Sequence, residues 1–203
     1  MKKLMIALGA VALAAGVQAA QFQWSNGTAI SPEGDATKTV TSGTIYLFDS
    51  AKYSQQTLFN ALAATPNWNM STVTALASAN AYNTATLSTA TKFKTVDKGT
   101  LSTGKAYWDP VADGYSVGSS YNFYQVLVDG DNFYITDNVL TPVSDTGNSA
   151  IKFANNESRT YSDAVALPAT FEHGGWYTAV PEPTSGLLLL LGVAGLALRR
   201  RRA

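Results

Sequence analysis

The chain has 203 residues, no cysteine, and fourteen basic against fourteen acidic side chains. Without cysteine it is not a disulfide scaffold, a thiolate metal site or an enzyme with a cysteine nucleophile. The basic residues are concentrated at the two ends, so residues 20–183 contain eight basic against fourteen acidic side chains, a net charge of −6. An acidic body without a Lys/Arg cluster repels a phosphate backbone, and no nucleic-acid partner is expected.

The first nineteen residues have the parts of a secretory signal peptide. Lys2 and Lys3 form a positive start, an apolar run extends from Leu4 to Gly16, and small residues lead up to Ala19. We expect signal peptidase to cleave after Ala19. The alternative is an uncleaved N-terminal anchor, but about 13 helical residues that rise 1.5 Å each are short for a ~30 Å hydrocarbon core.

Residues 20–179 are expected to fold as one extracytoplasmic domain. Short apolar and aromatic runs alternate there with turn residues, a pattern typical of antiparallel β-structure. The predicted strands are Gln21 to Trp24, Thr37 to Thr41, Thr44 to Phe48, Lys92 to Val96, Ala150 to Phe153 and Trp176 to Thr178.

Two helices are compatible with the stretch that follows the third of these strands. Ser50 could cap a helix from Ala51 to Ala64 that ends before Pro66. A second helix over Ser71 to Ala81 is rich in threonine and asparagine and therefore less strongly indicated. The fold expected for the body is mainly β, an antiparallel β-sandwich-like domain with one or two short helices.

A hairpin is the clearest element of the body. Two β-rich runs, Tyr121 to Val128 and Asp131 to Thr136, flank the dipeptide Asp129-Gly130. An Asp-Gly pair between such runs favours a type I′ turn, whose central residues both need positive φ.

Carboxylates and a histidine raise the question of a metal or catalytic site. Asp129, Asp131 and Asp137 could suit calcium, but Phe133 occupies a ligand position of an EF-hand loop and turn chemistry already explains Asp129-Gly130. His173, beside Glu172, is the only histidine, so one chain cannot form a His₂ or His₃ zinc site.

We therefore predict no metal and no cofactor, and we interpret His173 as a polar turn residue before the last strand. No Gly-x-Ser-x-Gly elbow is present, and the few glutamates suggest no glycosidase pair. The sequence predicts a protein that is not an enzyme.

Aromatic residues offer a different kind of site. Trp68, between two asparagines, and Trp108, before Asp109-Pro110, have loop-like surroundings and are the tryptophans expected to be exposed. Their faces could stack on sugars, which would make the body a carbohydrate-binding module. The alternative, which the sequence favours, is that these rings pack in the core.

Three segments follow one another at the C-terminus. Val180, Pro181, Glu182 and Pro183 cannot join a helix interior, because proline fixes φ and lacks the amide donor. The next segment is an apolar run about 20 Å long as a helix, which a basic cluster on the cytoplasmic side would orient. The run contains Gly186, Leu187, Leu188, Leu189, Leu190, Leu191 and Leu198, and the cluster is Arg199, Arg200, Arg201 and Arg202.

Residues 180–203 resemble the PEP-CTERM sorting signal, also known as the VPEP or ice-binding-protein C-terminal motif. The resemblance lies in Val180 to Pro183, the apolar run and the arginine cluster, in that order. It implies recognition by an exosortase, a membrane cysteine peptidase, in a Gram-negative bacterium that makes exopolysaccharide. The alternative is a plain tail anchor, although the helix is short for a permanent span.

The prediction from sequence is an exported, non-enzymatic surface protein, anchored in the inner membrane by its tail before processing. Its expected partners are the secretion machinery, an exosortase-like peptidase and extracellular polysaccharide, the last through resemblance alone. A carbohydrate-binding module and a small hydrolase are the alternative functions.

Overall fold

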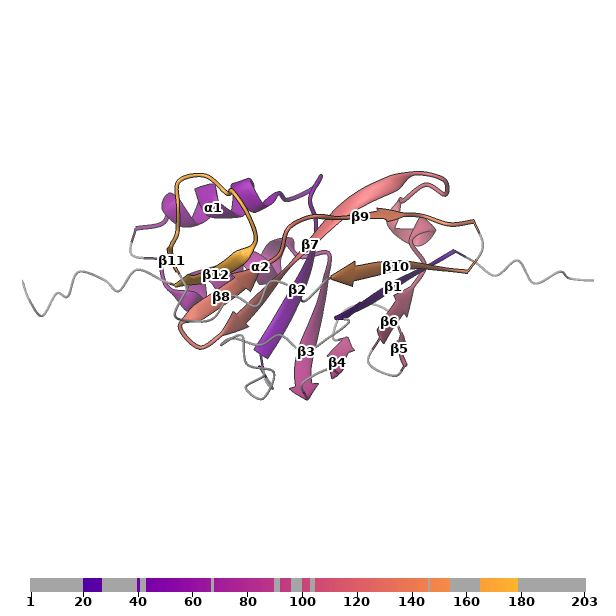
Figure 1. Cartoon of the computed structure of the whole chain (residues 1–203), viewed down its shortest axis with the longest axis horizontal. Helices are drawn as coiled ribbons and strands as arrows, with labels where there is room; N and C mark the ends of the chain where they lie inside the picture. Colours follow the sequence, from indigo (N-terminus) through magenta and orange to yellow (C-terminus); the bar gives the residue numbers. More distant parts are fainter. Residues whose placement is uncertain are drawn as a thin grey trace, which may run out of the picture.

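Two β-sheets and a pair of helices make up the body in the computed structural model of the chain (Figure 1). The structure describes residues 20–26, 40, 43–66, 68–89, 92–95, 100–102, 105–145, 147–153 and 165–178. The expected signal peptide and sorting tail lie outside the described residues. So does the strand predicted over Thr37 to Thr41, apart from Val40.

The larger sheet has β7 (Ser120–Asp129) and β2 (Gly43–Asp49) at its centre. Their side chains point alternately to two buried faces, so both strands are largely apolar without a polar face. In order across the sheet, the described strands are β11 (Val165–Ala166), β12 (Gly175–Thr178), β8 (Asn132–Ile135), β7, β2, β3 (Asn83–Thr89) and β4 (Lys92–Thr95), and β9 (Val139–Pro142) pairs with β7.

The smaller sheet covers one face of the larger sheet and completes a sandwich. Its described strands, in order, are β10 (Asn148–Phe153), β1 (Gln21–Asn26), β6 (Lys105–Trp108) and β5 (Thr100–Ser102). Phe22 and Trp24 of β1 are fully buried in the core between the sheets, together with Ile45 and Leu47 of β2.

Two helices cover the other face of the larger sheet, α1 (Gln55–Ala63) and α2 (Met70–Asn80). Leu58 and Leu62 of α1 and Val73 of α2 pack there in a second core, against Phe48 and Tyr124 of the sheet. The rings of Phe48 and Tyr124, a directly opposed cross-strand pair, stack with centroids 4.8 Å apart. The layers are therefore sheet, sheet and helices.

This architecture confirms the mainly-β, sandwich-like class, with sheets that are largely antiparallel and two helices. Two neighbouring pairs differ from the antiparallel expectation: β1 pairs with β10, and β11 with β12, in parallel. More than a hundred residues separate β1 from β10, whereas β11 and β12 are only eight residues apart.

The predicted start of α1 was four residues too early. Ser54, not Ser50, is the N-cap, and its hydroxyl accepts a hydrogen bond from the Thr57 amide. Before the helix begins, the Asp49 carbonyl accepts bonds from the Lys52 and Tyr53 amides and forms a separate turn. Because this turn satisfies those donors, the helix can start only beyond it.

The hairpin is confirmed, but its turn lies one residue later than predicted. Asp129 pairs with Asn132, so Gly130 and Asp131 form the two-residue loop between β7 and β8. Gly130 has φ +57°, the left-handed conformation that such a turn requires.

Candidate functional site

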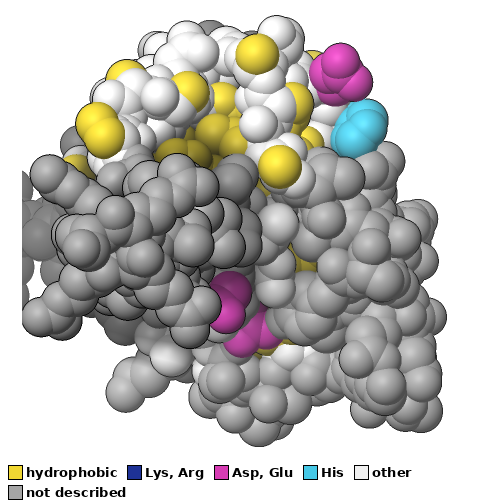
Figure 2. Space-filling view, turned by 90° about the vertical axis from the view of Figure 1, so that its left-hand side faces the viewer, with side chains coloured by type: hydrophobic (Ala, Val, Ile, Leu, Met, Phe, Trp, Pro, Cys, Tyr) yellow, Lys and Arg dark blue, Asp and Glu magenta, His cyan; other side chains and the backbone are white. Residues whose placement is uncertain are grey.

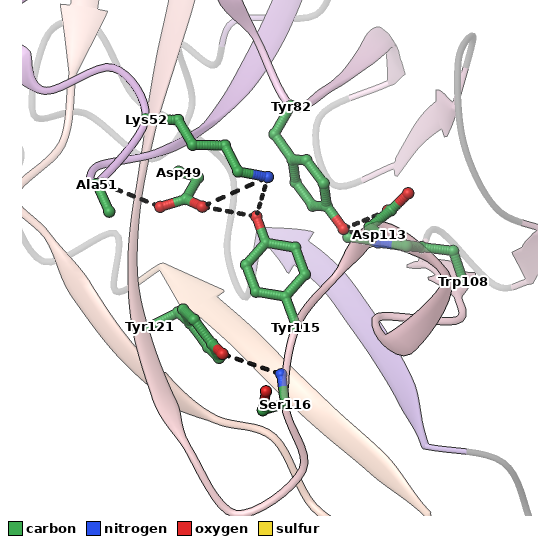
Figure 3. Close-up of polar contacts among 9 residues, drawn as sticks. All are labelled: Asp49, Ala51, Lys52, Tyr82, Trp108, Asp113, Tyr115, Ser116 and Tyr121. Atoms are coloured by element: carbon green, nitrogen blue, oxygen red, sulfur yellow. Dashed lines mark hydrogen bonds and ion pairs between the residues drawn. The ribbon is translucent and has the colours of Figure 1, made fainter.

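A polar network lies at the edge of the sandwich where β2 ends (Figure 3). At its centre is Asp49, whose side chain is only 4% exposed. Its carboxylate accepts hydrogen bonds from the Ala51 amide at 2.9 Å and from the Tyr115 hydroxyl at 2.7 Å. A buried carboxylate needs such donors, because burying a charge without partners is costly.

Lys52 covers this carboxylate from the solvent side. Its Nζ lies 3.9 Å from Asp49 Oδ2 and donates to the Tyr115 hydroxyl at 3.4 Å. The same ammonium lies 4.8 Å from the ring centroid of Tyr115 and 5.5 Å from that of Tyr82. Cation–π and charge interactions thus act together, although Lys52 remains 60% exposed and solvent screens both.

The other half of the network connects the two sheets. Tyr82, which precedes β3 of the larger sheet, donates its hydroxyl to Asp113 at 2.5 Å. The same oxygen accepts from the indole Nε1 of Trp108, on β6 of the smaller sheet, at 2.7 Å. The chain of contacts seen in Figure 3 therefore links the larger sheet to the smaller one through directional bonds.

The environment keeps both tyrosine hydroxyls protonated. Burial, followed by the hydrogen bond to Asp113, raises the pKa of Tyr82 far above its ordinary value of 10. Burial and the bond to Asp49 raise the pKa of Tyr115 in the same direction. Each hydroxyl donates to a carboxylate and keeps its proton, which makes it a poor general base. The hydrogen bonds of the network are better suited to holding the sheets together.

Trp108 is buried, as the favoured alternative of core packing predicted, and it lacks the exposure that its loop-like surroundings suggested. Only 8% of it is accessible, and its ring meets Phe22 edge to face at 5.8 Å in the core between the sheets. The expectation was wrong because Trp108 ends a strand, β6, instead of lying in a loop.

Trp68 lies in a different layer. It is half-buried and packs on the core beneath the helices, with its ring 6.3 Å from that of Phe133. The larger sheet separates Trp68 from Trp108. The two tryptophans therefore cannot form one sugar-stacking platform.

The remaining candidates occupy turns. Asp137 accepts a hydrogen bond from the Gly174 amide at 2.8 Å, and the carbonyl of His173 accepts from the Tyr177 hydroxyl at 2.9 Å. His173 thus lies in the bend that leads into β12, as interpreted from the sequence. Within the described ranges, no three His, Asp or Glu side chains are grouped so that they could hold a metal ion.

Apart from Trp108, no residue of the network is among the sites expected from sequence. Asp49 and Tyr115 are 66 positions apart and belong to no motif. The one available signal is a carboxylate at the end of an otherwise apolar strand, which must find a buried partner once the strand is buried.

The sorting residues expected at the C-terminus and the cleavage site at Ala19 lie outside the described residues. No helix in the part of the chain that the structure describes is long and apolar enough to cross a membrane.

Comparison with known families decides the nature of the tail. Residues 179–202 match the family model described as the PEP-CTERM protein-sorting motif. This chain carries a PEP-CTERM sorting motif. The match includes Val180 to Pro183, the apolar run and all four terminal arginines, as the resemblance implied. No curated protein and no solved structure matches the chain.

A PEP-CTERM motif indicates a protein that is exported, anchored in a membrane before processing, and sorted by an exosortase. The motif covers the tail only and carries no information on what the body binds.

Proposed function

We propose that this protein is a non-enzymatic component of the cell surface or extracellular matrix of a Gram-negative-type bacterium. A signal peptide, residues 1–19, directs its export. The apolar run from Gly186 to Leu198 then holds it in the inner membrane, until an exosortase-like peptidase acts near Val180 to Pro183 and the body is passed to the surface.

The single observation that carries this proposal is the PEP-CTERM match at residues 179–202. The physical properties of the segment agree with it. Proline is unsuited to a helix interior, so we expect Pro181-Glu182-Pro183 to be open to a peptidase. The arginines Arg199 to Arg202 resist translocation and retain the end of the chain on the cytoplasmic side.

The use of the body's buried polar groups supports a non-enzymatic role. The Tyr115 hydroxyl is committed to Asp49, and the Tyr82 hydroxyl to Asp113. The bond from Trp108 to Tyr82 also couples the two sheets. Polar groups committed in this way stabilise a surface domain that has no disulfide to do so.

Replacing Pro181, Glu182 and Pro183 together by alanine tests the proposal. Export should continue, because the signal peptide is intact, but the protein should keep its tail and stay in the membrane fraction. A matched control replaces Ser185 by alanine, outside the Pro-Glu-Pro triplet, and should be processed like the parent. If the triple variant had the same mature mass and the same distribution as the parent, the sorting proposal would be wrong.

A second candidate function is contact with extracellular polysaccharide through Trp68. The half-buried ring of Trp68 supports it, because the partly exposed face of an indole could stack on a sugar. Trp68→Ala should abolish co-sedimentation with the host polysaccharide, and Trp68→Phe should preserve part of it. Failure of the parent protein to co-sediment would remove this candidate and leave the sorting proposal unaffected.

A further inference from the structure

The side of the body viewed in Figure 2 carries an apolar surface. Four half-buried side chains that pack on the core beneath the helices are called the apolar end: Trp68, Met70, Leu167 and Phe171. Figure 2 shows hydrophobic side chains gathered in a shallow hollow, with a histidine and an acidic side chain at its edge and further acidic side chains lower on the same face. No lysine or arginine is visible on the described part of this face.

The chain leaves the sheet beside the apolar end. Thr178, the last residue of β12, pairs with Ala166 of β11, and Leu167 follows directly. The ring of Trp68 contacts Phe133, which pairs with the residue before Thr178. Whatever lies at the exit of the chain therefore also faces Trp68 and Leu167.

Hydrogen bonds hold the loop that contributes to this surface. The side chain of Gln56, on α1, accepts from the Phe171 amide at 2.8 Å and donates to the Ala169 carbonyl at 3.1 Å. The ring of Phe171 meets Phe59 edge to face at 5.5 Å. The apolar end is thus fixed before any partner arrives, and binding would require little ordering.

Charge is absent from the adjoining helical layer. Between Tyr53 and Thr91 the sequence contains no Asp, Glu, Lys, Arg or His, and this stretch includes all of α1 and α2. Surface helices ordinarily carry charged residues on their solvent side. In an acidic body, this uncharged layer is the part that can approach an apolar interface without the cost of removing charged side chains from water.

The length of the connection decides which end faces the membrane. Seven residues separate Thr178 from Gly186, the start of the apolar run. An extended chain spans at most ~3.6 Å per residue, so the reach is about 30 Å. A body of about 150 residues has a radius of gyration of ~15 Å and hence a diameter of ~38 Å. Since the tether is shorter than the body is wide, the exit end must lie nearest the bilayer.

We propose that the apolar end is a membrane-contacting surface, which rests on a zwitterionic phospholipid surface while the protein is anchored and before its tail is processed. The inference rests on the membrane span in the proposed function. A tether this short raises the effective concentration of the surface to the millimolar range, so a weak apolar contact is enough. Tryptophan is the side chain best suited to the interface, because its ring is amphipathic.

Among the described residues, the most exposed large hydrophobic side chains lie elsewhere and provide a matched control. Leu140 on β9 is 63% exposed and Val111 is 52% exposed. Figure 1 places β9 away from β11 and β12, so the tether does not direct this region to the bilayer. Exposure alone would favour Leu140 as the membrane contact, whereas the tether favours Trp68.

Tryptophan fluorescence of the full chain distinguishes these possibilities. Trp24, Trp108 and Trp176 are buried between the sheets, so a quencher in the acyl chains can reach only Trp68. The full chain would be reconstituted into phosphatidylcholine vesicles with or without brominated acyl chains. We expect brominated lipid to remove about a quarter of the emission from the parent, and Trp68→Phe to abolish that loss.

Further variants and a flotation assay complete the test. Leu167→Ser should reduce the quenching, Leu140→Ser should leave it unchanged, and every variant should float with the vesicles. If the parent floats but is quenched no more than Trp68→Phe, the inference is overturned, while the membrane span still holds. Failure to float would contradict the span itself and the inference with it. Trp68 emission that responds to soluble polysaccharide and not to brominated lipid would show that lipid is the wrong partner.

Discussion

At the scale of single residues, the body depends on how it satisfies one buried carboxylate. Asp49 ends strand β2 directly after four apolar residues, and it is buried. Tyr115 and the Ala51 amide donate to it directly, and Lys52 approaches from the solvent. Removal of one donor leaves part of the desolvation cost of the carboxylate uncompensated.

Tyr115→Phe should therefore lower the free energy of unfolding by about 1.5–3 kcal/mol, the range for a hydrogen bond to a charged group. Lys52→Met is the control, because an exposed ion pair contributes about 1 kcal/mol or less. Urea denaturation of both variants measures the difference. If both variants lost the same free energy of unfolding, the Tyr115–Asp49 hydrogen bond would contribute no more than the exposed ion pair.

Stability should also fall at alkaline pH. Burial raises the pKa of Tyr82, Tyr115 and Tyr124 well above 10 in the folded protein. Below pH 10 the tyrosines are protonated in both the folded and the unfolded state, so they do not make the free energy of unfolding depend on pH. Above pH 10 the unfolded chain releases protons that the folded protein retains, so each tyrosine costs up to about 1.4 kcal/mol per pH unit.

Denaturation curves at pH 8, 10 and 11 test this dependence. Tyr124 gives a matched variant, because its buried hydroxyl has no hydrogen-bond partner among the described residues. Tyr124→Phe should cost little at pH 8 and should make the alkaline decline shallower. Stability that stays constant from pH 8 to pH 11 would contradict the account.

At the scale of elements, a cap defines the start of α2. The side chain of Asn69 accepts from the Thr72 amide at 3.2 Å, and the Thr72 hydroxyl accepts from the Asn69 amide at 3.3 Å. Asn69→Ala should cost about 1 kcal/mol, whereas Asn69→Asp keeps an acceptor and should cost much less. Thermal unfolding of the pair measures this, and similar midpoints for both variants would exclude the reciprocal cap.

The start of β2 requires a glycine. Gly43 has φ +140°, and a Cβ there would lie 2.8 Å from the backbone oxygen of Val128 on the neighbouring strand. Gly43→Ala should therefore destabilise the sheet by more than about 1 kcal/mol. Gly118→Ala is the control, because φ is again positive but no atom lies within 4 Å of the added carbon. A smaller loss at Gly43 than at Gly118 would contradict this reading of the strand contact.

Local patterns in the sequence were enough to find several of these elements. The runs that became β1, β2, β10 and β12 were predicted from short apolar stretches, and the β7–β8 hairpin from its turn residues. The errors have physical causes. By sequence, Ser50 and Ser54 are equally good N-caps. Only the turn in which the Asp49 carbonyl accepts from the Lys52 and Tyr53 amides excludes Ser50 as the cap.

Long-range features could not be predicted in this way. The parallel pairing of β1 with β10 joins distant segments, and no local periodicity encodes a partner. The same holds for the bond between Asp49 and Tyr115. Trp108 was placed in a loop because Asp109-Pro110 follows it, although the strand ends only there. The sorting signal was predictable because its parts are contiguous.

At the scale of the whole molecule, a layered body is combined with a C-terminal sorting motif. The body stacks two sheets and a helical layer around two cores. The PEP-CTERM motif begins at residue 179, directly after the last strand of the described residues. Cleavage within the motif would therefore leave every described strand intact.

The central claim is that the chain is exported and then processed at its tail. Intact mass spectrometry of the native protein, recovered from the cell surface and medium of its host and of the same host without its exosortase, tests that claim most directly. We expect a surface form that lacks residues 1–19 and the segment beyond the Pro-Glu-Pro triplet, and retention of the tail when the exosortase is missing. A full-length protein in the cytosol, with both ends intact in both hosts, would contradict it.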